Sequence, residues 1–267
     1  MPTTSWEDVV VPSVSRFVQL VQRTRDAWSE ARGELDPWFR GQRSAQWGLV
    51  PGLYRPGAPT VHEDNLRHEI LHRAHAFVAD ATYPPVTEWD WYFLMQHHGM
   101  PTRLLDWTES ALVALYFAIR DDVGSDASHA RQGDHAGVWI LDPWVLNSRV
   151  ARRSDAVYSY RSSPVRPYLR PLWGRGKLPR PPIAFDPPYN SRRLAAQRGK
   201  FTIHGSSRRA IEKYAGQREG LRKLLIPLSR RRSMMRDLLT LGIAESVVFP
   251  ELAGLSREIT TVWRERL

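Results

Sequence analysis

A polar interruption inside the most apolar part of the chain constrains the fold more than any other feature. Trp89–Arg120 is strongly apolar, yet its centre, His97–Arg103, holds two histidines, a glycine, a proline and an arginine. Because glycine and proline break regular structure, this part cannot be one long helix. We expect two helices flanking a turn and a short extended segment, at Asp90–His97, Thr102–Asp106 and Thr108–Ile119, with Thr108 capping the second helix.

Helical and strand-like patterns follow one another irregularly along the rest of the chain. Apolar spacing predicts further helices at Ser13–Arg32, Val61–Thr82, Arg208–Ala215, Ser233–Leu241 and Leu255–Glu265. Strands or extended segments are predicted at Pro37–Arg43, Val138–Leu141, Gly199–His204, Leu221–Ile226 and Val247–Pro250. This irregular order favours an α+β fold. We expect a single compact mixed domain over residues 1–267, with a central, mostly antiparallel sheet and flanking helices.

The 267 residues include no cysteine, which excludes disulfides, thiolate metal sites and a cysteine nucleophile. No apolar run is long enough to span a membrane, and the first residues do not resemble a signal peptide. The sequence also lacks a P-loop, a dinucleotide-binding glycine fingerprint and a nucleophile elbow, which disfavours ATPases, Rossmann dehydrogenases and α/β-hydrolases. We expect a cytoplasmic protein without a membrane partner.

Basic residues are concentrated in one part of the chain. Residues 147–240 hold 23 basic and five acidic residues, whereas the rest of the chain holds 15 basic and 23 acidic. Residues 148–190 are rich in arginine and proline and predict a long, irregular insertion between a helical part, 1–120, and a final part, 191–267. These charges are either solvated surface groups or contacts to an anionic partner such as nucleic acid.

A nucleic-acid surface would combine basic side chains with aromatic rings that stack on bases. The candidate phosphate contacts are Arg152, Arg153, Arg161, Arg166, Arg170 and Arg175. The interleaved aromatic residues are Tyr158, Tyr160, Tyr168 and Trp173.

Three segments together resemble the FRG domain family, which is named for its Phe/Tyr-Arg-Gly motif. They are Trp38–Gln42, with the sequence Trp-Phe-Arg-Gly-Gln, the long segment Leu94–Thr108, and Asn190–Thr202. The later segment Gly242–Gly254 is similar to the family's closing motif, although aspartate is more usual there than Glu251. The resemblance extends over nearly the whole chain and implies little about activity.

Polar residues in these segments form the candidate site. Arg40 lies beside Gly41, which lets another backbone or a ligand approach closely, and an arginine there suits a phosphate or carboxylate. Polar residues in an apolar stretch form either a pocket wall or an internal network, such as an Arg40–Asp106 ion pair. We expect cofactor binding by Arg40, Gln42, Arg103, Asp106 and Gln197, in one cleft with His98.

The order of these features is also similar to that of ADP-ribosyltransferases, which use NAD⁺ as the donor. An arginine on an early strand precedes an extended segment, a helix with Tyr116-Phe117-Ala118, and a late strand with an acid before Phe-Pro. The similarity implies an NAD-dependent transferase, which would be a toxin or an anti-phage effector in a bacterium. Its catalytic candidates are Glu245, Glu251 and His98.

Two other functions remain open. The chain could be a nucleic-acid-binding module without catalysis. It could also be a zinc hydrolase, because His68-Glu69-x-x-His72 fits the His-Glu-x-x-His pattern on a predicted helix. Such a site lacks an obvious third ligand, with Glu88 suitable only by its distance along the chain, so we expect no metal.

Overall fold

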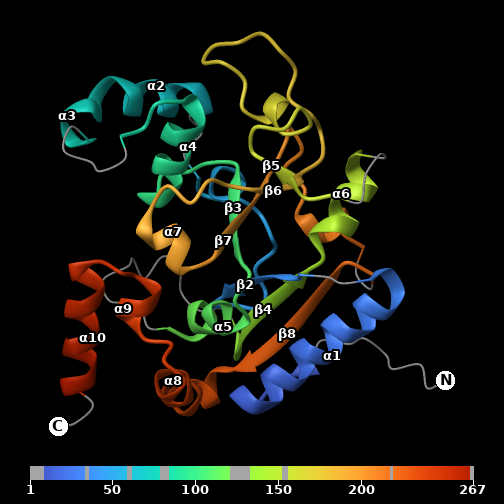
Figure 1. Ribbon diagram of the computed structural model, residues 1–267, viewed down its shortest axis with the longest axis vertical. Helices are drawn as coiled ribbons and strands as arrows, with labels where there is room; N and C mark the ends of the chain where they lie inside the picture. Colours follow the sequence, from blue (N-terminus) through green and yellow to red (C-terminus); the bar gives the residue numbers. More distant parts are fainter. Residues whose placement is uncertain are drawn as a thin grey trace.

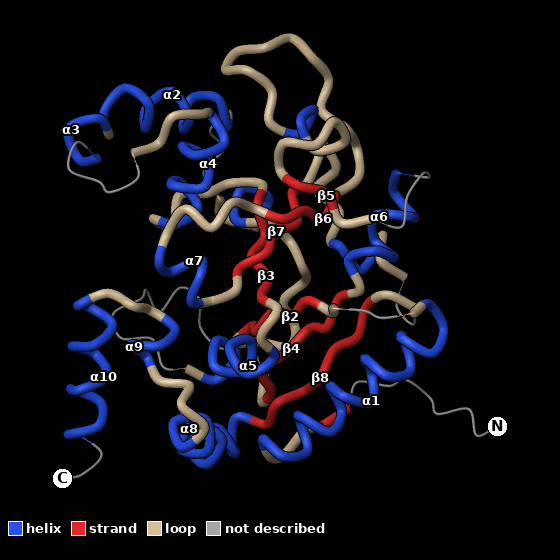
Figure 2. Tube along the Cα trace, in the orientation of Figure 1, coloured by secondary structure: helices blue, strands red, loops and turns tan. Residues whose placement is uncertain are grey.

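The computed structural model describes residues 9–33, 36–58, 62–78, 84–120, 133–151, 156–216 and 219–264. Its centre is an eight-stranded mixed sheet with the order β1-β8-β4-β2-β3-β7-β6-β5 (Figures 1 and 2). The strands are β1 Val9–Val10, β2 Trp38–Gln42, β3 Leu104–Thr108, β4 His135–Leu141, β5 Tyr158–Ser159, β6 Ile183–Asp186, β7 Gly199–Ile203 and β8 Leu221–Pro227. All neighbouring strands are antiparallel except β1–β8 and β5–β6. The predicted α+β fold is confirmed.

Helices surround this sheet. The α-helices are α1 Val14–Arg32, α2 Glu63–Arg73, α3 His75–Val78, α4 Glu88–His97, α5 Ala111–Ile119, α6 Pro143–Ala151, α7 Arg192–Ala196, α8 Arg231–Thr240, α9 Glu245–Val248 and α10 Leu252–Arg264. The short 3₁₀ helices are η1 Gly52–Tyr54, η3 Arg166–Tyr168, η4 Ile211–Lys213 and η5 Leu228–Arg230. In the described part of the chain, no helix combines the length and the hydrophobicity needed to cross a bilayer.

The two faces of the sheet carry different cores, as the alternation of β4 shows. Val138 and Ile140 pack with α1, α5 and α8, whereas Trp139 and Leu141 pack on the other face. On the first face, α4 forms a second core with β3, β6 and β7. The first face is therefore covered in two halves, one over β2, β4 and β8 and one over β3, β7 and β6.

The two halves meet where β2 and β3 pair at a single position, Phe39 opposite Thr108. If this antiparallel ladder continued, Gly41 would lie opposite Asp106. Instead, Arg40 Nη1 donates a hydrogen bond to the main-chain oxygen of Asp106 at 2.6 Å. A side chain therefore occupies the place of the missing strand–strand bond and bridges the gap.

Several sequence predictions need correction. Residues 148–190 are not wholly irregular, because the apolar residues of β6 are buried in the sheet. The helix predicted at Arg208–Ala215 is only the single turn η4, since the Ile211 amide is used in a bond to the Leu49 oxygen. The segment predicted to be extended, Val247–Pro250, is helical in its first half. Val247 and Val248 are the last residues of the helix α9, because Val248 packs into the core.

Two helix boundaries also differ from the sequence predictions. Thr108 is the last residue of β3, and α5 is capped by Ser110, whose hydroxyl accepts from the Val113 amide at 3.3 Å. The helix predicted over Val61–Thr82 begins at Glu63 and ends at Arg73, and α3 is a separate short turn after it. The cap lies two residues later than predicted at α5, and the helix α2 ends nine residues before the predicted Thr82, which lies outside the described residues.

Gly41 allows α5 to pack directly against β2. A Cβ atom at this position would lie 1.9 Å from the main-chain oxygen of Ala114 and 2.6 Å from the amide nitrogen of Ala118. Both atoms belong to the backbone of α5 and cannot move away as a side chain could. The glycine of the Trp-Phe-Arg-Gly-Gln segment is therefore required by packing.

We predict that Gly41→Ala lowers the free energy of unfolding by about 3 kcal/mol, because the new methyl group would force α5 off the sheet. Denaturant unfolding of the purified protein measures this change. Gly176→Ala is the matched control, since a Cβ atom there meets open space and the backbone is not left-handed. Equal, small losses for both variants would contradict the packing role of Gly41.

Candidate functional site

A cleft of about 670 Å³ opens between α4 and α7, with β3 and β7 beneath it. Its volume is within the range of small-molecule sites. The side of α4 contributes Phe93, Gln96, His97 and His98, and the other side contributes Asn190, Arg192, Arg193 and Gln197. Asp106 of β3 lies between these two walls, as expected from the sequence.

Among the described residues, two carboxylates line the cleft, and Asp106 is the one not used in capping, because Asp90 accepts from Thr87 at the start of α4. The Asp106 side chain is 56% exposed, and Gln96 Nε2 donates a hydrogen bond to its Oδ2 at 2.8 Å. Arg40 Nη1 lies 3.6 Å from the same oxygen. Gln96 is itself held by Thr102, whose hydroxyl donates to Gln96 Oε1. The carboxylate is therefore fixed from two sides but open toward the cleft.

Arg40 supports the cleft from below rather than lining it. Burial lowers the pKa of its guanidinium to about 10, although Asp106 opposes this shift. Its Nε is buried and has no hydrogen-bond partner among the described residues. From the sequence, an Arg40–Asp106 ion pair and a cleft were alternatives, but both are present, because Asp106 contacts Arg40 and also lines the cleft.

The opposite wall is tied to the end of β3. The Thr108 hydroxyl donates to the Gln197 main-chain oxygen at 2.6 Å, and Gln197 Nε2 donates to the Val248 oxygen at 3.1 Å. Gln197 therefore links β3 to α9. His97 faces Arg193 across the cleft, and burial, Arg193 and His98 all lower the pKa of its imidazole, so His97 is neutral at pH 7.

The two glutamates expected to act in catalysis lie outside the cleft. Glu245 begins α9 instead of lying on a late strand, and both its oxygens are engaged, one by the Tyr116 hydroxyl and the other by Arg257 Nε at 2.8 Å. Glu251 lies at the rim, 3.9 Å from His97 Nε2. His98, the third candidate, lines the cleft from the end of α4 and is exposed.

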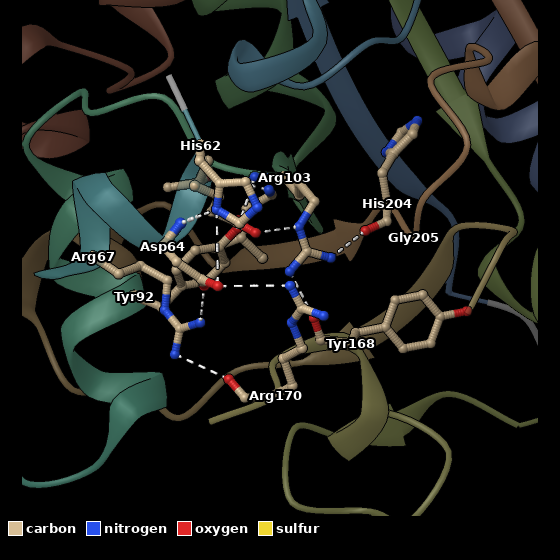
Figure 3. A network of polar contacts seen from close by, with 12 residues as sticks. His62, Asp64, Arg67, Tyr92, Arg103, Tyr168, Arg170, His204 and Gly205 are labelled. Carbon is tan, nitrogen blue, oxygen red and sulfur yellow. Dashed lines mark hydrogen bonds and ion pairs between the residues drawn. The ribbon is translucent and has the colours of Figure 1, made fainter. Parts of the chain in front are cut away.

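Arg103, predicted to bind the cofactor in the same cleft, is instead buried in a separate polar network (Figure 3). Its Nε donates to Glu63 Oε2 at 2.8 Å, and its two terminal nitrogens donate to the main-chain oxygens of His204 and Tyr168 at 2.8 and 2.6 Å. Tyr92 donates from its hydroxyl to Glu63 and accepts from the Arg103 amide. Arg103 therefore joins four parts of the chain and is unavailable to a ligand.

A second set of charges extends this network toward the basic segment. Arg67 donates to Asp64 Oδ1 at 3.1 Å and to the Arg170 main-chain oxygen at 3.0 Å, and Arg170 Nη2 lies 3.6 Å from Asp64 (Figure 3). Arg170 is therefore an internal ion-pair partner rather than a free phosphate contact. Gln42 is also structural, because its Oε1 accepts from Trp139 Nε1 at 2.7 Å within the core.

The remaining basic candidates divide by exposure. Arg161, Arg166 and Arg175 are exposed, whereas Arg152 and Arg153 lie outside the described residues. Of the interleaved aromatic residues, Tyr160 and Tyr168 are buried in the core and Tyr158 is partly buried. Only Trp173 among these four residues is largely exposed, at 55%.

The His-Glu-x-x-His segment lies on α2, where the rings of His68 and His72 stack with their centroids 6.1 Å apart. Glu69 pairs with Arg73 at 2.8 Å. The third ligand considered from the sequence, Glu88, pairs with Arg67 at 2.5 Å. In the described residues, no group of three or more histidine, aspartate or glutamate side chains is arranged to hold a metal.

Comparison with known families identifies the part of the chain that forms one side of this site. Residues 36–127 match the family model of the FRG domain. The FRG match includes β2, α4, β3 and α5, and thus Arg40, Gly41 and Asp106. The similar segments Asn190–Thr202 and Gly242–Gly254 lie outside it. No curated protein and no solved structure matches the chain.

The sequence interpretation missed the partners that organise the site. Gln96 and Arg193 were not among the predicted site residues, although both line the cleft, and Glu63, the partner of Arg103, was not singled out. The sequence did contain a sign that Arg103 would not share a site with Asp106, because residues 103 and 106 of an extended segment lie on opposite faces. No local signal pointed to Glu63, which lies forty residues earlier.

We predict that Arg103→Met lowers the free energy of unfolding by about 3–5 kcal/mol, because it leaves Glu63 buried without its countercharge. Glu63 is only 12% exposed, so water cannot replace the guanidinium fully. Urea unfolding measures the loss. The same change at the exposed Arg166 is the control and should cost less than about 0.5 kcal/mol. A small effect at both positions would show that the network does not stabilise the fold.

A second prediction concerns pH. His204 is fully buried, and this burial lowers the pKa of its imidazole to about 4. The unfolded chain takes up this proton near pH 6.5, so the stability contributed by neutral His204 is present above pH 6.5 and is lost as the pH falls toward 4. Over this range the loss is about 3 kcal/mol. His204→Gln should flatten this dependence, measured by unfolding at each pH, whereas His72→Gln should not.

Proposed function

We propose that the cleft binds NAD⁺ and that the protein transfers ADP-ribose from it to an anionic macromolecule, as a cytoplasmic toxin or anti-phage effector would. The observation that supports this proposal is Asp106. It is an exposed carboxylate on a rigid strand, held by Gln96, with Arg40 beneath it and Arg193 on the opposite wall.

The cleft has the groups that a dinucleotide requires. Phe93 and Phe201 stack with their centroids 5.5 Å apart and form an apolar floor of the cleft, although both are almost fully buried. Arg192 and Arg193 line the opposite wall and supply positive charge for a pyrophosphate. The buried Nε of Arg40, without a partner among the described residues, leaves a donor unused beneath the carboxylate.

NAD⁺ supplies an ADP-ribosyl group whose bond to nicotinamide breaks with both electrons leaving on the ring nitrogen. Asp106 would act on the positive charge that develops at the ribose carbon, and would take the proton that the acceptor loses as its oxygen or nitrogen bonds to that carbon. Asp106 suits this role better than Glu245, because both oxygens of Glu245 are already engaged. Because the pKa of His97 is lowered, this histidine adds no positive charge that would repel the charge developing at the ribose carbon.

A non-catalytic nucleic-acid-binding module is the second candidate. It is supported by the exposed arginines Arg161, Arg166 and Arg175 around Trp173, whose ring is 55% exposed. Such a surface would lose affinity steeply as salt increases, since each phosphate contact releases a counterion. Binding of RNA or DNA with this salt dependence and without NAD⁺ turnover would favour this candidate.

We predict that Asp106→Asn reduces nicotinamide release by roughly 100-fold or more while changing NAD⁺ affinity only a few-fold. Asparagine keeps the acceptor for Gln96, and the main-chain oxygen still accepts from Arg40, so the fold should be retained with some loss of stability because Arg40 loses its countercharge. Asp237→Asn is the matched control, because Asp237 is exposed on α8, away from the cleft. Nicotinamide release is measured by chromatography, with RNA, DNA and protein acceptors supplied.

Two results would contradict the proposal. One is a wild-type protein that neither binds nor consumes NAD⁺ with any of these acceptors. The other is an Asp106→Asn variant that releases nicotinamide as fast as the wild type, since the proposed reaction depends on this carboxylate.

A further inference from the structure

Three arginines from separate elements converge on one aromatic ring beside the cleft. The guanidinium carbons of Arg120, Arg193 and Arg257 lie 4.7, 4.6 and 5.6 Å from the centre of the Phe249 ring. Arg120 follows α5, Arg193 belongs to α7, and Arg257 belongs to α10. Figure 1 shows these helices gathered around α9. We call Arg120, Arg193 and Arg257 the arginine cluster.

The arginine cluster has guanidinium donors that no close ion pair within the described part of the chain uses. Arg257 pairs with Glu245, which also accepts from Tyr116. Among the described residues, no carboxylate lies within ion-pair distance of Arg120 or Arg193. The Nε of Arg120 is buried and lacks a hydrogen-bond partner in the same set. A ring can hold a guanidinium by its face, but it leaves the N–H donors at the edge unused.

Charges of both signs surround Arg193. Burial is the main cause that lowers the pKa of its guanidinium; Asp106 and Glu251 raise it, and Arg120 and Arg257 lower it by smaller effects. Arg120 and Arg257 are near enough to repel Arg193, and an anion held between the three guanidinium groups would relieve that repulsion. Arg193 lines the cleft and Arg120 and Arg257 do not, so Arg193 is the member of the arginine cluster that connects it to the cleft.

We infer that the arginine cluster is a phosphate-binding site at the end of the cleft. Planar guanidinium forks match the oxygens of a phosphoryl group, and three of them suit a pyrophosphate. This inference deepens the proposed function and rests on it for the identity of the ligand, because it places the phosphates of the donor at Arg193 and leaves Asp106 for the ribose. The phosphate-binding property itself requires no reaction.

The test uses the full chain and two probes, inorganic phosphate and ADP-ribose, measured by isothermal titration. We expect both to bind the wild type and to compete with each other, with ADP-ribose the tighter ligand. Arg193→Gln and Arg120→Gln should each weaken ADP-ribose binding about ten-fold or more, since each removes a charge-assisted bond. Arg236→Gln, at an exposed position of α8, is the control and should bind as the wild type does.

A melting experiment tests phosphate binding on the wild type alone, so a variant that fails to fold cannot affect its result. Phosphate at millimolar concentration should raise the melting temperature of the wild type, because a ligand that binds only the folded state stabilises it. If inorganic phosphate binds but ADP-ribose does not, the site takes free phosphate and the nucleotide assignment is wrong. If neither probe binds or stabilises the wild type, or if the cluster variants bind as well as Arg236→Gln, the inference is overturned.

Asp106→Asn separates this inference from the proposed function. Asp106 lies outside the arginine cluster but is proposed to face the ribose, so this variant should lose nicotinamide release while its ADP-ribose affinity changes only a few-fold, less than in the cluster variants. Phosphate and ADP-ribose binding without any NAD⁺ consumption would support the phosphate site and contradict the transferase. NAD⁺ consumption that persists in Arg120→Gln and Arg193→Gln, with unchanged ADP-ribose affinity, would support the transferase and contradict the site.

Discussion

The hydrogen bond from Arg40 to the main-chain oxygen of Asp106 closes a gap that the sheet leaves between β2 and β3. Because this bond replaces a strand–strand bond, the two halves of the sheet can separate without leaving a buried carbonyl unpaired. The separation turns the Asp106 side chain toward solvent between α4 and α7. One guanidinium therefore contributes to the continuity of the sheet and to the charge beneath the candidate site.

The second half of the sheet depends on a different arginine. Arg103 connects α2, η3 and the end of β7 through Glu63 and two main-chain oxygens. The basic segment is thus attached to the domain by internal ion pairs and carbonyl contacts, and part of its arginine content is structural. The two arginines have different structural roles. Arg40 lies beneath the cleft, and Arg103 fixes the start of the strand that carries Asp106.

The sequence predicted the local elements well, because apolar spacing and caps are local. The helix predicted at Ser13–Arg32 is present as α1, and Ser13 is its cap, with a hydroxyl that accepts from the Arg16 amide. Contacts between residues far apart in the sequence were harder to predict. The apolar Val247-Val-Phe run favours an extended chain by propensity, but burial of Val248 decides for a helix. The convergence of Arg120, Arg193 and Arg257 joins residues more than sixty positions apart, and no spacing rule could predict it.

Gly41 has a consequence beyond packing, because α5 ends beside Arg120. The helix rests on β2 with no side chain between the two backbones at this point. Gly41 touches α5 at Ala114 and Ala118, so the separation of helix and strand there directly affects the position of Arg120, two residues after Ala118. The glycine of the FRG motif therefore acts as a spacer that sets the height of Arg120 above the sheet, although it touches no ligand. A change of geometry at Gly41 would therefore also move the Arg120 guanidinium relative to the Phe249 ring, which it contacts at 4.7 Å.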